Sequence, residues 1–229
     1  KESTPGSILK AIEKEKVINC FFGTPLVPTL ANSPDVSKYD HSSLRRIVTA
    51  GAPLPAEVWN KAIELSGNVF SPVYGTCELG PITFLSPEEL IFEGPPEKAK
   101  GYSCGKEALS TEIRVVDEEG NDMPPGQVGE VIIRGKHMMA GYWKAPKATE
   151  EAIRNGYFYT GDLGMLDEDG YLYLIGRKKD IIASQGKLIS PSEVEDVIYH
   201  HPAVLEAAVI GVPDEQLGEA VKAFIVLKS

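Results

Sequence analysis

The sequence has few of the residues that build metal centres and disulfide frameworks. It contains 3 cysteines and 4 histidines in 229 residues. Cys20, Cys77 and Cys104 are widely spaced and odd in number, so they form neither a set of paired disulfides nor a CxxC metal site. Sparse, unpatterned cysteine is typical of a reducing compartment, and we expect a cytoplasmic protein.

Long apolar runs and an excess of basic residues are also missing. No run approaches the roughly 18 apolar residues that a membrane span needs, so no membrane span is expected. The 33 acidic and 23 basic residues give a formal net charge of −10. Because phosphate backbones attract Lys/Arg-rich surfaces, we do not expect nucleic acid as a partner. The common nucleotide and zinc signatures GxxxxGK[ST], GxGxxG and HExxH are absent as well.

The first hundred residues alternate between strand and helix patterns. Short apolar runs separated by helical spacing predict parallel βαβ units. The expected strands are residues 17–22, 44–49 and 69–74, with helices at 7–16 and 55–65.

From about Gly101 the pattern becomes antiparallel. Alternating runs flank turn sequences such as Asp167-Glu168-Asp169-Gly170, which is typical of hairpins. Strands are expected at 111–116, 129–134, 162–166 and 171–175, followed by a hairpin over 181–189 that turns at Gln185-Gly186, a helix over 191–199, and strands at 204–212 and 221–227.

These patterns predict a mixed fold, α/β and α+β, in three parts. Residues 1–100 form the βαβ portion of a large domain, and residues 101–176 form its antiparallel, barrel-like β subdomain. The polar stretch Arg177–Asp180 is a linker, and residues 177–229 form a hinge and a small α+β C-terminal domain. Because a domain this short seldom folds stably by itself, we expect it to be incomplete.

Two short polar motifs could carry chemistry. Tyr74-Gly75-Thr76-Cys77-Glu78 follows a buried strand, where open α/β sheets bind ligands. Glu78 could hold Mg²⁺ together with phosphate oxygens, and Tyr74 could stack on a base. The alternative is a plain turn with a solvated acid.

A second pair of motifs could bind a ribose. In Tyr159-Thr160-Gly161-Asp162 the carboxylate of Asp162 could accept hydrogen bonds from two ribose hydroxyls. Arg177, in Gly176-Arg177, could bridge hydroxyl and phosphate oxygens. The alternatives are an ordinary Gly-Asp turn and a surface charge.

The order of the motifs is more specific than any one of them. Together they resemble the adenylate-forming superfamily of acyl-CoA synthetases, luciferases and peptide-synthetase adenylation domains, over essentially the whole chain. The motifs, in chain order, are Thr49-Ala50-Gly51-Ala52-Pro53-Leu54, Tyr-Gly-x-x-Glu at 74–78, Gly129-Glu130-Val131 with Gly135 and Gly141-Tyr142, Tyr-Thr-Gly-Asp at 159–162, and Gly-Arg-x-x-Asp at 176–180 with Gly186 and Pro191-x-Glu193-Val194-Glu195.

The resemblance implies a two-step ligase. A carboxylic acid and ATP give an acyl-adenylate, and coenzyme A then takes the acyl group as a thioester. By similarity, Gly51, Ala52, Pro53 and Tyr74 line the adenine site, Glu78 is the catalytic residue that meets Mg²⁺, and Asp162 and Arg177 hold the ribose of ATP or AMP. In this family the small C-terminal domain rotates between the two half-reactions. By similarity, Lys179 falls at the hinge of this rotation, and Gly186 on the hairpin beside the CoA tunnel.

The hinge segment favours the acyl-CoA synthetases, and with them fatty acid metabolism, within this superfamily. Two alternatives stay open, the adenylation domain of a peptide synthetase and a folded piece without catalysis. The small-molecule acid is not specified by these residues.

The sequence departs from the family pattern in three ways. Cys77 stands where relatives usually carry Thr, and Leu188 where many carry a polar residue. The family's phosphate loop and its C-terminal lysine are not in this sequence. We therefore expect a fragment that folds, does not turn over by itself, and self-associates through exposed sheet edges.

Overall fold

The computed structural model describes residues 4–94 and 99–228 of the chain. These residues divide into two compact units. The first unit comprises Lys1–Glu112, Arg134–Thr149 and Leu166–Tyr173, and the second comprises Ile113–Ile133, Glu150–Met165 and Leu174–Ser229. The division at residues 101 and 177 stays a prediction from the sequence.

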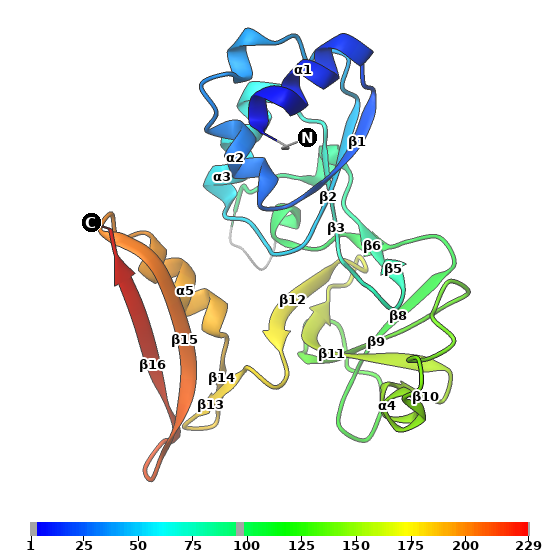
Figure 1. Ribbon diagram of the computed structural model, residues 1–229. Coiled ribbons are helices and arrows are strands. Elements are labelled where there is room, and N and C mark those ends of the chain that lie inside the picture. The colour runs from blue at the N-terminus through cyan, green and yellow to red at the C-terminus, as the bar shows by residue number, and fades with distance from the viewer. Residues whose placement is uncertain (1–3, 95–98, 229) are drawn as a thin grey trace. The chain divides into compact units, whose positions relative to one another are not determined.

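The first unit is built on a three-stranded parallel sheet, as the sequence predicts. Strands β1 (Asn19–Gly23), β2 (Arg46–Ala50) and β3 (Phe70–Val73) lie side by side in that order. Helices α1 (Pro5–Glu15), α2 (Leu26–Ala31) and α3 (Ala56–Ser66) pack around them (Figure 1). Thr4 caps α1, because its Oγ1 accepts a hydrogen bond from the N–H of Ser7.

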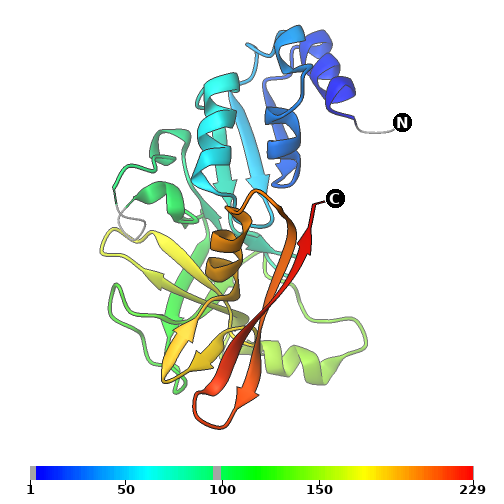
Figure 2. The same cartoon turned by 90° about the vertical axis from the view of Figure 1, so that its left-hand side faces the viewer.

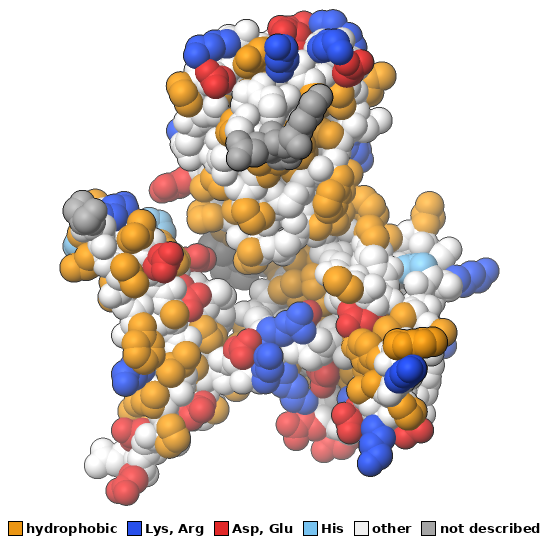
Figure 3. Space-filling model, in the orientation of Figure 1, with side chains coloured by type: hydrophobic (Ala, Val, Ile, Leu, Met, Phe, Trp, Pro, Cys, Tyr) orange, Lys and Arg blue, Asp and Glu red, His pale blue; other side chains and the backbone are white. Residues whose placement is uncertain are grey.

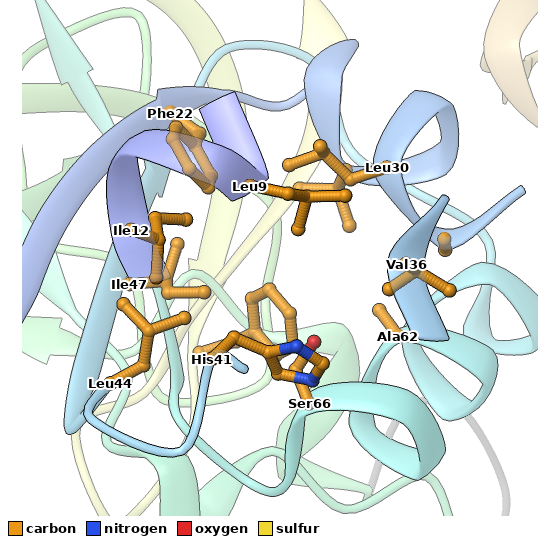
Figure 4. A pocket seen from close by; sticks show the side chains of 13 residues that line it. Leu9, Ile12, Phe22, Leu30, Val36, His41, Leu44, Ile47, Ala62 and Ser66 are labelled. Atoms are coloured by element: carbon orange, nitrogen blue, oxygen red, sulfur yellow. The ribbon is translucent and has the colours of Figure 1, made fainter. Parts of the chain in front are cut away.

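The apolar faces of these helices and of the sheet enclose a small pocket (Figure 4). Leu9 and Ile12 of α1 and Ile47 of β2 line it, with Ile12 beside Ile47, and the imidazole of His41 lies at its edge. The two ring nitrogens of His41 lie 3.1 Å from the carbonyl oxygen of Tyr39 and 3.0 Å from that of Leu65. This pocket belongs to the core that supports the sheet.

Short elements follow β3 in the first unit. They are β4 (Gly75–Thr76), β5 (Gly80–Pro81), β6 (Thr83–Phe84) and β7 (Lys106–Glu107), with 3₁₀ turns at Pro87–Glu89 and Lys100–Tyr102; a further 3₁₀ turn, Val36–Lys38, precedes β2. Strand β4 pairs with β5, and β6 pairs with β7, both antiparallel. The sequence patterns did not predict these two-residue strands, because alternation needs a longer window to be visible.

The antiparallel section is a five-stranded sheet in the order β10-β11-β9-β8, with β12 paired to β11. Its strands are β8 (Thr111–Val116), β9 (Gly129–Gly135), β10 (Ile153–Arg154), β11 (Tyr157–Leu166) and β12 (Leu172–Arg177), and helix α4 (Pro146–Ala152) precedes β10. Val116, Ile132 and Tyr157 form a buried cluster on it. The antiparallel prediction is confirmed, although α4 and β10 were not predicted and β11 begins earlier than expected.

The C-terminal elements of the second unit form a curved hairpin with one helix against it (Figure 2). The sheet order is β14 (Lys187–Ile189), β13 (Ile182–Ser184), β16 (Gly218–Leu227), β15 (Val204–Asp214). Helix α5 (Pro191–Tyr199) spans the residues that the sequence predicts, with Pro191 in its first turn. It packs on β15, where Glu195 Oε1 accepts a hydrogen bond from the N–H of Val209 at 2.8 Å.

No helix among the described residues is long and apolar enough to cross a bilayer.

Candidate functional site

The predicted adenine-site residues follow two neighbouring strands of the first unit. Gly51, Ala52 and Pro53 come directly after β2, and Tyr74 comes directly after β3. Ala50 and Val73, the last residues of these strands, are partners in the parallel ladder. The sheet therefore brings the two segments to the same edge, where open α/β sheets bind their ligands.

Gly51 occupies a position that suits only glycine. Its φ is +134°, and a Cβ there would lie 2.7 Å from Thr24 Oγ1. Gly51, Ala52 and Pro53 are all exposed. The segment is thus a shaped, accessible turn against which a flat ligand could lie.

Glu78 lies in the tight turn between β4 and β5. Gly75 pairs with Pro81 across this turn, and a Cβ on Gly75 would lie 2.3 Å from the carbonyl oxygen of Gly80. The glycine therefore lets the two short strands approach closely enough to fix the turn. This close approach explains why the Tyr-Gly-x-x-Glu motif has glycine at its second position.

A second segment of the first unit holds Glu78 at two points. The backbone carbonyl of Glu78 accepts a hydrogen bond from the N–H of Met139 at 2.8 Å, and Oε1 of Glu78 accepts one from the hydroxyl of Tyr142 at 2.8 Å. Sequence reasoning noted Gly141-Tyr142 as a motif but gave it no role. The contact joins residues 64 positions apart, which no local spacing reveals.

The two residues before Glu78 differ in their surroundings. Cys77 is exposed. The Oγ1 of Thr76 is buried and has no hydrogen-bond partner among the described residues. A buried hydroxyl without a partner is costly, so such groups often mark a ligand site.

The predicted ribose-binding residues meet in the second unit. The register between β11 and β9 shifts between Tyr159 and Leu163, and Gly161 has a φ of +70°. A bulge of this kind redirects side chains out of the regular ladder. It leaves Asp162 mostly buried, with Oδ1 2.9 Å from Nε of Arg177.

Thr160 fixes this bulge, a role that sequence reasoning missed. Its hydroxyl donates to the carbonyl oxygen of Val131 at 2.8 Å and accepts from the N–H of Asp162 at 3.0 Å. Nη1 of Arg177 donates to the carbonyl oxygen of Thr160 at 3.1 Å. Carboxylate and guanidinium are therefore held in one place by β9, β11 and β12.

The predicted hinge follows directly after Arg177. Lys179 is exposed in a turn, in which the N–H groups of Asp180 and Ile181 donate to the carbonyl oxygen of Arg177. Beside it, Nζ of Lys178 lies 3.1 Å from Oε2 of Glu130, whose side chain is 13% exposed. Lys179 itself is exposed, and its role as a hinge stays a prediction.

Gly186 lies at the tip of the β13–β14 hairpin, where Ser184 pairs with Lys187. Gln185 and Gly186 have φ values of +51° and +74°, as two-residue hairpin turns require. Apart from its chain neighbours, no atom of the described residues lies within 4 Å of the place that a Cβ on Gly186 would occupy, so this turn leaves room for an approaching ligand.

The described residues contain no group of three or more His, Cys, Asp or Glu side chains that could hold a metal ion. Glu78 offers one carboxylate, a donor of the kind that Mg²⁺ prefers. Because Mg²⁺ is often bound by one or two carboxylates together with substrate phosphates, a single carboxylate fits a metal that arrives with a nucleotide.

Comparison with known proteins identifies the family. The sequence model of the family described as AMP-binding enzyme matches residues 1–143, and that of the AMP-binding enzyme C-terminal domain matches residues 193–229.

Two named groups of relatives are similar to the chain. It is 38% identical over 203 residues to a long-chain-fatty-acid–CoA ligase of Escherichia coli, covering 89% of the chain and 35% of that enzyme. It is 38% identical over 223 residues to a feruloyl-CoA synthase of an Amycolatopsis species, covering 97% of the chain and 44% of that enzyme. The chain thus spans about a third to somewhat under half of the length of the relatives it matches.

Solved structures share the fold. The amide bond synthetase McbA of Marinactinospora thermotolerans superposes with a TM-score of 0.87 at 36% identity, over 100% of this chain and 45% of that one. The O-succinylbenzoate coenzyme A synthetase of Bacillus subtilis, in complex with ATP and magnesium ion, gives 0.85 at 32% identity, over 98% of this chain and 44% of that one.

Proposed function

Because the chain belongs to the AMP-binding enzyme family, we propose that it is the nucleotide-binding part of an ATP-dependent acid–thiol ligase. The observation that carries the proposal is the ion pair of Asp162 and Arg177 on the bulge of β11. A mostly buried carboxylate held beside a guanidinium is suited to two vicinal hydroxyls next to a phosphate.

The proposed reaction has two steps. A carboxylate oxygen of the acid attacks the α-phosphorus of ATP, the bond between the α- and β-phosphates breaks, and pyrophosphate leaves. The thiol of coenzyme A then attacks the acyl carbon, a thioester forms, AMP leaves, and the thiol proton passes to solvent.

In this scheme the chain's own residues bind the nucleotide and orient it. Gly51, Ala52 and Pro53 would lie against the adenine with Tyr74 beside them. Asp162 would accept hydrogen bonds from the ribose hydroxyls while Arg177 keeps the carboxylate in place. Such positioning lowers the entropic barrier of the reaction between two substrates.

The metal and the thiol complete the proposal. Glu78 would hold Mg²⁺, which supplies charge neutralisation for the phosphates of the nucleotide when bound. Lys179 would be the hinge, and the open turn at Gly186 would lie beside the pantetheine arm. The cytoplasm is the proposed location, supported by the absence of any disulfide among the described residues.

A chimeric enzyme tests the proposal. Because the chain covers 44% of the feruloyl-CoA synthase that it matches, it can replace the matching segment of that enzyme; we call the product the chimeric ligase. Exchange of labelled pyrophosphate into ATP, dependent on an added acid, is the expected result. A folded chimeric ligase without exchange on any of a panel of fatty and aromatic acids would contradict the proposal.

The panel holds acids of both kinds, because these residues do not specify the acid. Fatty acid metabolism is proposed from the fatty-acid–CoA ligase relatives, whereas the feruloyl-CoA synthase favours an aromatic acid.

A second candidate function differs in the acceptor. The match to an amide bond synthetase over the whole chain favours an amine in place of the thiol as the acceptor. Pyrophosphate exchange is the same for both, so mass spectrometry of the product with coenzyme A and with an amine separates them.

A further inference from the structure

Tyr142 belongs to a motif for which the proposed reaction gives no role. Its hydroxyl donates to Oε1 of Glu78 at 2.8 Å, and both residues lie in the first unit. The ring is 37% exposed, so packing alone does not account for a tyrosine at this position.

The backbone around Tyr142 is fixed by its neighbours. The N–H of Tyr142 donates to Oγ1 of Thr149 at 2.9 Å, and that hydroxyl donates to the carbonyl oxygen of Ala145 at 3.0 Å. Gly141 has a φ of +149°, and a Cβ there would lie 2.8 Å from Cγ2 of Thr149. The start of α4 and a required glycine thus set the direction in which the phenol points.

The same segment also holds the backbone of Glu78, since the N–H of Met139 donates to its carbonyl oxygen at 2.8 Å. Main chain and side chain of Glu78 are therefore bound by residues three positions apart in one loop. A carboxylate that must meet a metal benefits from such outer support, which fixes its orientation before the metal arrives.

We propose that Tyr142 is a positioning residue that orients the carboxylate of Glu78 for the metal of the bound nucleotide. This inference rests on the proposed function, and it assigns a purpose to the Gly141-Tyr142 motif. The hydroxyl group is the acting part, because the ring alone cannot donate a hydrogen bond to a carboxylate.

The first arm of the test uses the 229-residue chain itself. Tyrosines labelled with ¹³C at Cζ are observed by NMR at neutral pH, and the signal lost in Tyr142→Phe identifies Tyr142. In Glu78→Gln the chemical shift of Tyr142 should change, because a neutral amide is a weaker hydrogen-bond acceptor than a carboxylate, whereas Glu150→Gln, at an exposed acid on α4, should leave it unchanged. An unchanged Tyr142 signal in Glu78→Gln would overturn the inference whatever the fate of the proposed function.

The second arm measures metal binding without turnover in the chimeric ligase. Mn²⁺ binding in the presence of a non-hydrolysable ATP analogue is followed by electron paramagnetic resonance. Tyr142→Phe should weaken Mn²⁺ binding about tenfold, a typical cost of removing a group that orients a metal ligand. Trp143→Phe is the matched control, because Trp143 is 89% exposed and should change nothing.

The outcomes separate the two claims. In the background of Glu78→Gln, Tyr142→Phe should cost nothing more, because it acts through Glu78. Equal Mn²⁺ affinity in Tyr142→Phe and the unmodified chimeric ligase would overturn the inference and leave the proposed function intact. Absence of nucleotide-dependent Mn²⁺ binding in the unmodified chimeric ligase would remove the metal site that both claims need.

Discussion

Asp162 and Arg177 are the residues on which nucleotide affinity should depend most. Asp162→Ala removes the carboxylate, leaves Arg177 without its partner at 2.9 Å, and should raise the Michaelis constant for ATP or lower the rate of pyrophosphate exchange in the chimeric ligase. We expect a change of at least about tenfold, equivalent to ~1.4 kcal/mol of transition-state stabilisation. Asp117→Ala, at an exposed turn of the same unit, is the control. Unchanged exchange kinetics in Asp162→Ala would exclude a ribose-binding role.

Cys77 stands at a position where the family resemblance leads us to expect a threonine. A thiol is a weak hydrogen-bond donor, whereas the threonine usual at this position offers a hydroxyl to a phosphate. Because Cys77 is exposed, threonine should fit without repacking. We expect Cys77→Thr to increase pyrophosphate exchange in the chimeric ligase by about 2- to 10-fold, the range of one added hydrogen bond.

Cys77→Ser and Cys77→Ala complete this series. Serine also offers a hydroxyl and should show part of the increase, while alanine should match or fall below the natural chain. If alanine raised exchange as much as threonine, the gain would come from removing the thiol and not from a new donor.

At the scale of single residues, motif order predicted the meeting of Asp162 and Arg177, and the contacts around them confirm that they meet. It did not predict that Thr160 fixes the bulge or that Tyr142 holds Glu78. A threonine in a strand and a tyrosine in a loop are ordinary residues locally. Their roles arise only when the sheet brings distant segments together, so the signal is in the fold and not in the spacing.

Among the elements, the predicted hinge after Arg177 can be tested with proline at position 179. The hydrogen bonds of this turn come from the N–H groups of Lys178, Asp180 and Ile181, so proline at position 179 removes none of them. It would instead fix φ near −65° and restrict a backbone that the proposed cycle needs to rotate.

Lys179→Pro in the chimeric ligase should therefore keep pyrophosphate exchange within about twofold and reduce thioester formation by at least about tenfold. Lys179→Ala, which loses the charge but keeps the rotation, should preserve both steps. Equal loss of the two steps in the proline variant, or loss of neither, would contradict a hinge at Lys179.

The elements that the sequence predicted well are those with a long, regular pattern. Helix α5 has proline in its first turn and apolar spacing over its length, and its bounds agree with the prediction. Helix α4 has the sequence Pro-Lys-Ala-Thr-Glu-Glu-Ala and no buried residue. Without an apolar face it gives no periodic signal, which explains why it was not predicted.

At the scale of the whole molecule, hydrophobic side chains gather on the β15–β16 hairpin (Figure 3). Large apolar residues there are about half exposed, and they include Phe224, Ile225, Val226 and Leu227. Monomeric proteins seldom expose so many apolar residues side by side.

The edge of β16 is open over the same stretch. Strand β15 pairs with one edge along its length, whereas β13 meets the other edge only where Ser184 pairs with Gly218. Over 219–227, no other described strand pairs with that edge. A long apolar edge with unpaired N–H and C=O groups recruits other strands.

The isolated chain should therefore self-associate through β16 and have a solution mass above the 24.8 kDa of one copy that rises with concentration. Light scattering coupled to size exclusion measures this. Ile225→Lys places a charge on the open edge and should shift the chain toward the monomer. Leu109→Lys adds the same charge to a side chain that is 97% exposed elsewhere, and should leave the association unchanged. A natural chain that stays monomeric at every concentration would refute the association, and equal effects of the two lysine variants would show that net charge, not the β16 edge, controls it.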